Sequence, residues 1–193
     1  MNRKVVPAVL VYVHRDDEIL MIHRASKDPG RVDFHEGKWN GLGGKCEVDE
    51  SPLQAVHREL WEESGLDLPL ESFTPLGVLQ FPNFKPHKSR EKSEDWIVFI
   101  FTVHLKSGNL DREPLTENCE GTMSWIPTGE ILNLNLWPGD REFIPHVLAS
   151  RPFMGTIWYE ASKVREAWIQ VLGRQVASGM DSLSLLLEDR KSR

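Results

Sequence analysis

Three glutamates in this chain have a spacing that could bind a cation. Glu59, Glu62 and Glu63 stand at i, i+3 and i+4, so their carboxylates share one face if the segment is helical. At a separation of about 5 Å, each pair of these charges repels by roughly 3 kcal/mol at an effective dielectric of 20. Arg58 is adjacent but points about 100° away from Glu59 on a helix, whereas Mg²⁺ readily binds several carboxylates. The spacing therefore indicates a cation site, with a solvated acidic helix face as the alternative.

The segment that carries these glutamates has the signals of a helix from Ser51 to Ser64. Ser51 is a suitable N-cap, Pro52 fits the first helical position, and Gly65 is a typical C-cap residue. An apolar stripe is expected from Leu53, Val56 and Leu60. Residues 39–45, just before this helix, contain three glycines, so the backbone there must turn or approach something closely. We expect the site at this junction.

The other elements are predicted from runs of β-branched and aromatic residues and from apolar spacing. A hairpin is expected at 9–13 and 19–22, further strands at 76–81, 96–105, 123–126 and 156–159, and a short helix at 144–149. Residues 26–38 and 82–95 are expected to be loops. Apolar residues recur at helical spacing near the end of the chain (Val164, Trp168, Val171 and Leu172), which predicts a C-terminal helical extension over about 161–193. This pattern is typical of a mixed α/β domain.

The composition limits the class of protein. The 193 residues suit a single domain over 1–193, and 40% hydrophobic residues suffice for a core. The net charge of −6 argues against a stable nucleic-acid complex. The two cysteines, Cys46 and Cys119, have no CxxC spacing, which fits a reducing compartment. The basic and apolar start contains Pro7 and no cleavage signal, and no later run could span a membrane, so we expect a cytoplasmic protein without a membrane partner.

The acidic helix also completes a longer motif. Gly44, Glu50 and the run from Arg58 to Leu66 fit G-x5-E-x7-R-E-U-x-E-E-x-G-U, where U is aliphatic, at every specified position. This resembles the Nudix box, the signature of the Nudix hydrolases. The resemblance implies an α/β/α sandwich with a curved mixed sheet that hydrolyses pyrophosphate bonds with Mg²⁺ or Mn²⁺. It also implies that Glu59, Glu62 and Glu63 bind the metal, that the Gly44 carbonyl joins them, and that Glu50 pairs with Arg58.

Segments outside the box resemble one branch of that family, the MutT-homologue 8-oxo-dGTP diphosphatases. These segments are Trp-Asn-Gly-Leu-Gly-Gly-Lys at 39–45, Met-Ser-Trp-Ile at 123–126 and Trp-Pro-Gly-Asp at 137–140. The branch places the purine base at Asn40, Trp137 and Asp140, the phosphates near Arg24, and a further metal-binding acid at Glu120. Lys45, in the matching stretch, is also expected to bind substrate. The simpler alternatives are that Trp137 belongs to the core, Asn40 forms a turn, Asp140 caps a helix and Glu120 is solvated.

The resemblance predicts a nucleoside triphosphate pyrophosphohydrolase that converts 8-oxo-dGTP or a related nucleotide to the monophosphate and pyrophosphate. Glu63 or Glu120 would hold or deprotonate the attacking water, beside Glu59 and Arg58. Gly139 stands where the branch has a second aspartate, which weakens the expected discrimination between oxidised and normal guanine. Nucleoside diphosphate sugars, ADP-ribose and triphosphorylated RNA remain alternative substrates, and a homodimer remains open. A non-catalytic nucleotide-binding protein is the alternative of another class, which the intact box disfavours.

Overall fold

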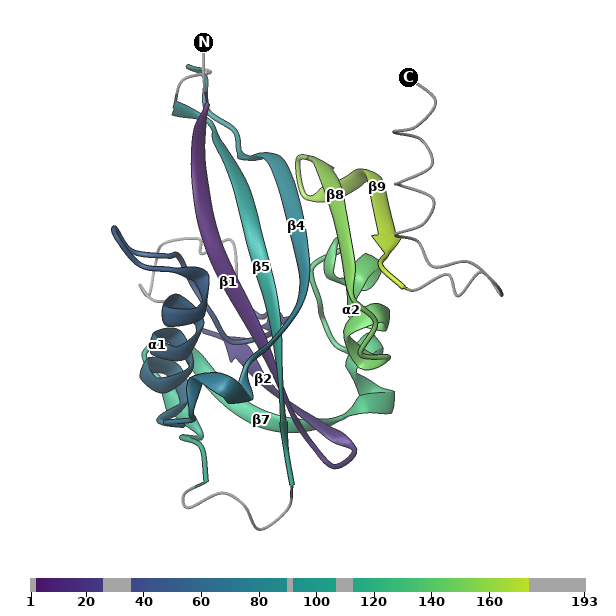
Figure 1. The fold of residues 1–193 in the computed structure, drawn as a ribbon. Coiled ribbons are helices and arrows are strands. Elements are labelled where there is room, and N and C mark those ends of the chain that lie inside the picture. Colours follow the sequence, from purple (N-terminus) through teal and green to yellow (C-terminus); the bar gives the residue numbers. More distant parts are fainter. Residues whose placement is uncertain (1–2, 26–35, 90–91, 107–112, 174–193) are drawn as a thin grey trace, which may run out of the picture.

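A long mixed sheet forms the centre of the molecule, with α1 on one side and α2 on the other (Figure 1). The computed structural model describes residues 3–25, 36–89, 92–106 and 113–173. Within them, nine strands are arranged in the order β6-β7-β2-β1-β5-β4-β8-β9, and β3 pairs with β2. The strands are β1 (Lys4–Arg15), β2 (Glu18–Arg24), β3 (Trp39–Asn40), β4 (Thr74–Lys85), β5 (Glu94–Leu105), β6 (Glu117–Asn118), β7 (Gly121–Pro127), β8 (Phe153–Glu160) and β9 (Lys163–Val171). The helices are α1 (Pro52–Ser64) and α2 (Asp140–Leu148), with short 3₁₀ turns η1 (Leu70–Ser72) and η3 (Thr128–Asn133).

The sheet combines parallel and antiparallel neighbours. β1 runs parallel to β5 along its whole length, from Lys4↔Glu94 to Arg15↔Leu105, and β4 runs parallel to β8. The β1–β2, β4–β5, β2–β7 and β8–β9 pairs are antiparallel. The predicted hairpin of β1 and β2 and the predicted α/β/α sandwich with a mixed sheet are thus confirmed.

Strand β1 separates two hydrophobic cores. Its residues Val9, Val11 and Val13 face the core that contains α1. Ala8 and Tyr12, which point the opposite way because side chains alternate along a strand, belong to the core that contains α2. β1 therefore contributes side chains to both hydrophobic cores, so a shift of this strand would change the packing on both faces of the sheet.

On the N-terminal side of Val13, the glycine-rich residues 42–45 replace β2 as the neighbour of β1. The Val11 amide donates to the Leu42 carbonyl and the Val9 amide to the Gly44 carbonyl, each at 2.8 Å. Gly43 has φ +143°, and an added Cβ would lie 2.2 Å from the Val9 carbonyl oxygen. Only glycine fits this close approach, which confirms the prediction made for this segment.

Helix α1 begins and ends where the sequence predicts. The Ser51 hydroxyl accepts a hydrogen bond from the Gln54 amide, and the Gln54 side-chain oxygen accepts one from the Ser51 amide, a capping box. Gly65 closes the helix with φ +72°. Val56 and Leu60 are buried against β1, and the third stripe residue, Leu53, is partly buried.

The helix predicted after residue 160 is wrong over its described part. Residues Lys163–Val171 form β9, which pairs with β8 from Phe153↔Val171 to Glu160↔Lys163, so 156–159 is not the last strand. Trp168 is 49% exposed, whereas Val164 and Ile169 pack against the core, so the residues grouped by helical spacing share no buried face. Pairing with β8 satisfies the backbone groups along an otherwise open sheet edge. Residues 174–193 lie outside the described part.

Other expected boundaries shift by a few residues. β4 continues to Lys85 and β5 begins at Glu94, so the loop predicted at 82–95 is shorter than expected. Helix α2 begins at Asp140 rather than Ile144. Most of the loop predicted at 26–38 falls outside the described residues. Within the described ranges, no helix has the length and apolar character needed to span a membrane.

Candidate active site

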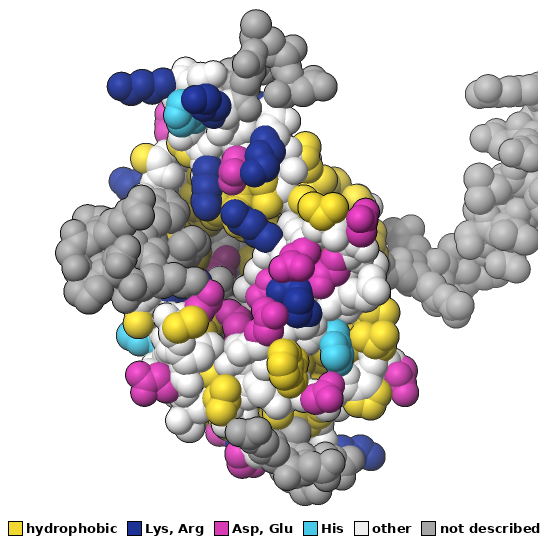
Figure 2. All heavy atoms as spheres, turned by 90° about the vertical axis from the view of Figure 1, so that its left-hand side faces the viewer, with side chains coloured by type: hydrophobic (Ala, Val, Ile, Leu, Met, Phe, Trp, Pro, Cys, Tyr) yellow, Lys and Arg dark blue, Asp and Glu magenta, His cyan; other side chains and the backbone are white. Residues whose placement is uncertain are grey.

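A cavity of about 510 Å³ lies against the sheet and reaches from α1 to the start of α2. Its wall is formed by strands β1, β2, β4, β5 and β8, the glycine-rich residues 39–45, the turn between β6 and β7, and residues around α1 and α2. Figure 2 shows the hollow beside a surface rich in acidic side chains, with basic side chains gathered above it. The predicted residues on its wall are Arg24, Asn40, Gly44, Lys45, Arg58, Glu59, Glu120, Trp137 and Asp140.

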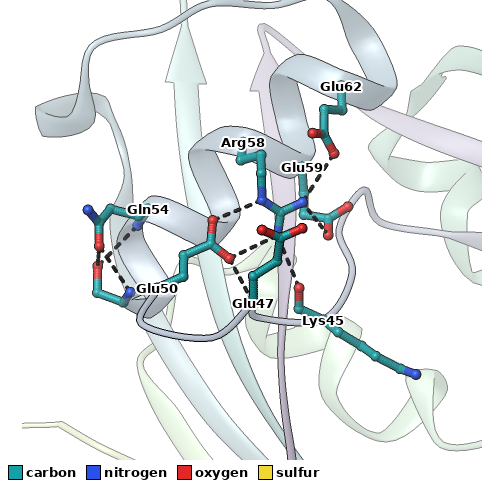
Figure 3. Close-up of polar contacts among 8 residues, drawn as sticks. Lys45, Glu47, Glu50, Gln54, Arg58, Glu59 and Glu62 are labelled. Atoms are coloured by element: carbon teal, nitrogen blue, oxygen red, sulfur yellow. Dashed lines mark hydrogen bonds and ion pairs between the residues drawn. The ribbon is translucent and has the colours of Figure 1, made fainter.

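Arg58 organises the acidic end of the cavity (Figure 3). Its Nε and Nη2 donate to the two oxygens of Glu50 at 2.8 and 2.9 Å, which confirms the expected pair. Its Nη1 donates to Glu59 at 2.9 Å and to Glu62 at 3.1 Å. The prediction that Arg58 points away from Glu59 is therefore wrong, because the long side chain bends back along the helix. One guanidinium partly neutralises both carboxylates.

The ion pairs and burial shift the acidities of these groups. The hydrogen bond from Arg58 lowers the pKa of Glu50, and the bond to Glu50 in turn raises the pKa of Arg58. Burial raises the pKa of Glu59 despite its bond with Arg58. A Cβ on Gly44 would lie 2.3 Å from Glu59 Oε1, so the glycine backbone is in close contact with this carboxylate.

Glu63 and Glu120 meet at a second arginine. Glu63 is only 5% exposed, and its Oε2 accepts a hydrogen bond from the Gly43 amide at 2.8 Å. Arg24 Nη1 lies 3.5 Å from Glu63 Oε1 and forms an ion pair with Glu120. Burial raises the pKa of Glu63, and the charge of Glu120 raises it further. Glu120 thus lines the cavity, paired with Arg24, and is not a solvated loop residue.

The oxygen donors at this end have the chemistry that Mg²⁺ or Mn²⁺ requires. They comprise Glu59 and Glu120 on the cavity wall, Glu62 and Glu63, which do not line it, and the Gly44 carbonyl, which also accepts from the Val9 amide. All are hard ligands. As the side chains lie, no three acidic, histidine or cysteine residues among those described are gathered closely enough to hold one ion. The two arginines draw the carboxylates into separate pairs. The donor set fits a cation, which would compete with these ion pairs.

The opposite end of the cavity is aromatic, with a few buried polar atoms. Trp137 and Asp140 are each 7% exposed and lie on the wall with Asn40. Asn40 Oδ1 and Asp140 Oδ2 are buried without a hydrogen-bond partner. Burial raises the pKa of Asp140 to about 7. Asp140 is the first residue of α2 and makes no side-chain cap, so the N-cap alternative is wrong.

The sequence did not identify the aromatic residues that complete this chamber. Phe81 and Phe84 from β4, Trp96 from β5 and Tyr159 from β8 all line the cavity. Each stands in an ordinary strand segment, where an aromatic residue is typical of the core. Only the pairing order of the sheet brings them to one chamber, so no local pattern could have found them.

A mixed sheet between two helical layers, with a glutamate-rich helix beside a cavity, is the arrangement expected of a hydrolase of pyrophosphate bonds. The family model described as NUDIX domain matches residues 4–147. The chain belongs to the Nudix family and is a Nudix hydrolase of the MutT-like kind.

Two related hydrolases and one solved MutT structure support membership of the Nudix family. The oxidized purine nucleoside triphosphate hydrolase of Danio rerio is 31% identical over 144 residues, which cover 70% of this chain and 83% of that protein. The protein of the same name from Mus musculus is 29% identical over 122 residues, 63% of this chain and 70% of that protein. The crystal structure of the mutator MutT protein from Bacillus halodurans superposes with a TM-score of 0.68 at 26% identity, over 86% of this chain and 97% of that one.

Proposed function

We propose that this chain is a divalent-metal-dependent nucleoside triphosphate pyrophosphohydrolase that acts on oxidised purine nucleotides such as 8-oxo-dGTP. The observation that carries the proposal is a cavity that joins an aromatic chamber, with unpartnered buried oxygens, to an end rich in carboxylates and arginines. A nucleotide has the same division into a flat base and a charged phosphate chain. The names of the relatives from Danio rerio and Mus musculus agree with this substrate class.

The aromatic chamber supplies groups for recognising an oxidised purine. Oxidation at C8 of guanine turns N7 from a hydrogen-bond acceptor into an N–H donor and adds a carbonyl. Asn40 Oδ1 is a free buried acceptor for an N–H group. Asp140, with a pKa of about 7, donates to a carbonyl when protonated and accepts when ionised. Trp137 offers a stacking face, which all purines share.

The acidic end is assigned to the phosphates and the metal. Glu59, Glu62, Glu63, Glu120 and the Gly44 carbonyl would hold the cation. A bound cation neutralises phosphate charge and makes water a better nucleophile. Arg24 and Lys45 face the same cavity, and we assign them to the phosphate oxygens. Glu63 or Glu120 would hold or deprotonate the attacking water, with pyrophosphate and a monophosphate as products.

A substrate panel tests the proposal. With Mg²⁺, we expect kcat/KM for 8-oxo-dGTP to exceed that for dGTP by about 10-fold, since a polar mismatch at a buried base edge costs affinity. The panel also includes ADP-ribose and a nucleoside diphosphate sugar, and the product is assayed as pyrophosphate against orthophosphate. Equal rates for 8-oxo-dGTP and dGTP, or orthophosphate as the main product, would contradict it.

A second candidate substrate, a 5′-triphosphorylated RNA end, is favoured by one feature of the cavity rim. The ammonium groups of Lys45 and Lys85 lie 5.4 and 5.1 Å from the ring centroid of Trp96. An aromatic ring with two cations close to it suits a nucleotide that continues beyond the first one. Faster pyrophosphate release from triphosphorylated RNA than from 8-oxo-dGTP would favour this candidate.

A further inference from the structure

Gly139 has no space for a side chain, although any residue could adopt its backbone conformation. Its φ of −70° is ordinary for any residue. A Cβ added there would lie 2.3 Å from the hydroxyl oxygen of Tyr159 and 3.0 Å from its Cζ. The hydroxyl of Tyr159 therefore fills the space that a side chain at residue 139 would need.

The Tyr159 hydroxyl is anchored as an acceptor and keeps its proton. Its oxygen accepts a hydrogen bond from the Gly139 amide at 2.8 Å. Burial, and secondarily the charge of Asp140, raise the pKa of Tyr159, so the hydroxyl is neutral at physiological pH. In the described part of the chain this hydroxyl donates no hydrogen bond. Its donor capacity is therefore available to a ligand.

The ring of Tyr159 holds this hydroxyl on the wall of the cavity. It packs against Phe84 and Phe81, with ring centroids 6.0 and 6.4 Å apart, and lines the cavity together with them. On the same wall, Asn40 Oδ1 and Asp140 Oδ2 are buried and unpartnered. Leaving a buried polar atom without a partner is unfavourable, so these groups favour a ligand that pairs with them.

We propose that the Tyr159 hydroxyl is a specificity-determining hydrogen-bond donor for a keto oxygen of the purine base. This inference rests on the proposed function. A donor at this point favours the keto oxygen at C6 or C8 over an amino group or a hydrogen in the same place. Because the Tyr159 oxygen already accepts from Gly139, it is a poor acceptor for the amino group of adenine.

Tyr159→Phe tests the proposal because it removes only the hydroxyl. The kcat/KM ratio of dITP to dATP compares a keto with an amino group at C6, and the ratio of 8-oxo-dGTP to dGTP reports on the C8 oxygen. We expect one of the two ratios to fall about 5- to 20-fold in Tyr159→Phe, as for loss of one buried hydrogen bond. The ratio that falls identifies the oxygen. If both ratios stay within twofold of wild type, the proposal is wrong.

Tyr12→Phe is the matched control. The Tyr12 hydroxyl is also buried and lacks a partner, but Tyr12 does not line the cavity. We expect both ratios to be unchanged in this variant. Equal falls in Tyr12→Phe and Tyr159→Phe would overturn the proposal, because they would show a general effect of removing a buried hydroxyl.

Two further measurements separate this inference from the proposed function. Calorimetric binding in EDTA of dIMP against dAMP, and of 8-oxo-dGMP against dGMP, needs neither metal nor turnover. We expect Tyr159→Phe to lower the preference for the additional keto oxygen in one of the two pairs. If wild type hydrolyses no nucleoside triphosphate, the proposed function fails while these binding ratios still decide the role of Tyr159. Gly139→Ala should lower the Tm less in the Tyr159→Phe background than in wild type, and an equal loss would refute the close placement of the hydroxyl.

Discussion

The two ends of the cavity differ in whether their polar groups have partners. At the α1 end, the carboxylates of Glu59 and Glu62 are paired with Arg58, and Glu120 is paired with Arg24. At the α2 end, single oxygens of Asn40 and Asp140 are buried without partners. A ligand at the first end must therefore exchange existing ion pairs for its own, whereas one at the second end adds bonds that were missing. Rate should depend on the first end and base choice on the second.

The largest expected effect is at the α1 end. We expect Glu63→Gln to lower kcat at least about 100-fold because a carboxylate proposed for metal and water is lost. The fold should survive, since Gln retains an oxygen for the Gly43 amide and removes a charge that burial disfavours. Steady-state kinetics with Mg²⁺ and a thermal melt check both parts, and Glu62→Gln should behave alike. A variant as active as wild type, or full activity in EDTA, would remove the proposed metal role.

Arg58→Met is expected to cost about 2 kcal/mol of unfolding free energy. It leaves Glu50, whose side chain is only 13% exposed, without its bidentate partner. Lys4→Met is the control, because the exposed Lys4–Glu94 pair should contribute less than about 0.5 kcal/mol. Urea unfolding of both variants measures the difference. Similar losses of unfolding free energy in the two variants would show that the Arg58–Glu50 pair stabilises the fold no more than an exposed ion pair does.

Much of the α1 end could be predicted from sequence because its parts are close in the chain. Residues 44–66 contain the cap, the apolar stripe and the glutamates, and helical periodicity relates them directly. The reach of Arg58 back to Glu59 could not be predicted, since a helical wheel gives the direction of Cβ and not the path of a long side chain. The outcome depends on the flexible part of that side chain.

The α2 end could be predicted only through resemblance. Asn40, Trp137 and Asp140 were located in this way, but Phe84 and Tyr159 come from strands that meet through sheet pairing. The prediction of a helix in the C-terminal segment was wrong for a related reason. Apolar spacing there suggested a helix, while the open edge of β8 selected a strand, and that edge is visible only once the sheet is assembled.

Trp137→Ala sharpens the contrast at the α2 end. We expect KM to rise about 10-fold for dGTP and 8-oxo-dGTP alike, because a stacking face contributes affinity without distinguishing purines. kcat should change little, since the carboxylates are untouched. A changed ratio between the two substrates would show that Trp137 also reads the base.

The smallest expected effect is a pH-dependent stability difference at Asp140. With a folded-state pKa of about 7 against the ordinary 3.8, the folded protein binds a proton that the unfolded chain has lost between these values. Stability contributed by this group is therefore greatest at low pH and falls as the pH rises towards 7. Asp140→Asn cannot ionise, so it should gain about 1 kcal/mol relative to wild type between pH 6 and pH 7. Urea unfolding at both pH values measures it, and a constant difference would contradict the raised pKa.

The pairing of the glycine stretch with β1 has a consequence for hydrogen exchange. The Val9 and Val11 amides donate to the Gly44 and Leu42 carbonyls, so their protons can exchange with solvent only when residues 42–44 leave the strand. Those same residues contact Glu59 and Glu63. The deuterium uptake of the Val9 and Val11 amides thus measures how often residues 42–44 separate from β1. A ligand that stabilises residues 42–44 should slow the exchange of both amides.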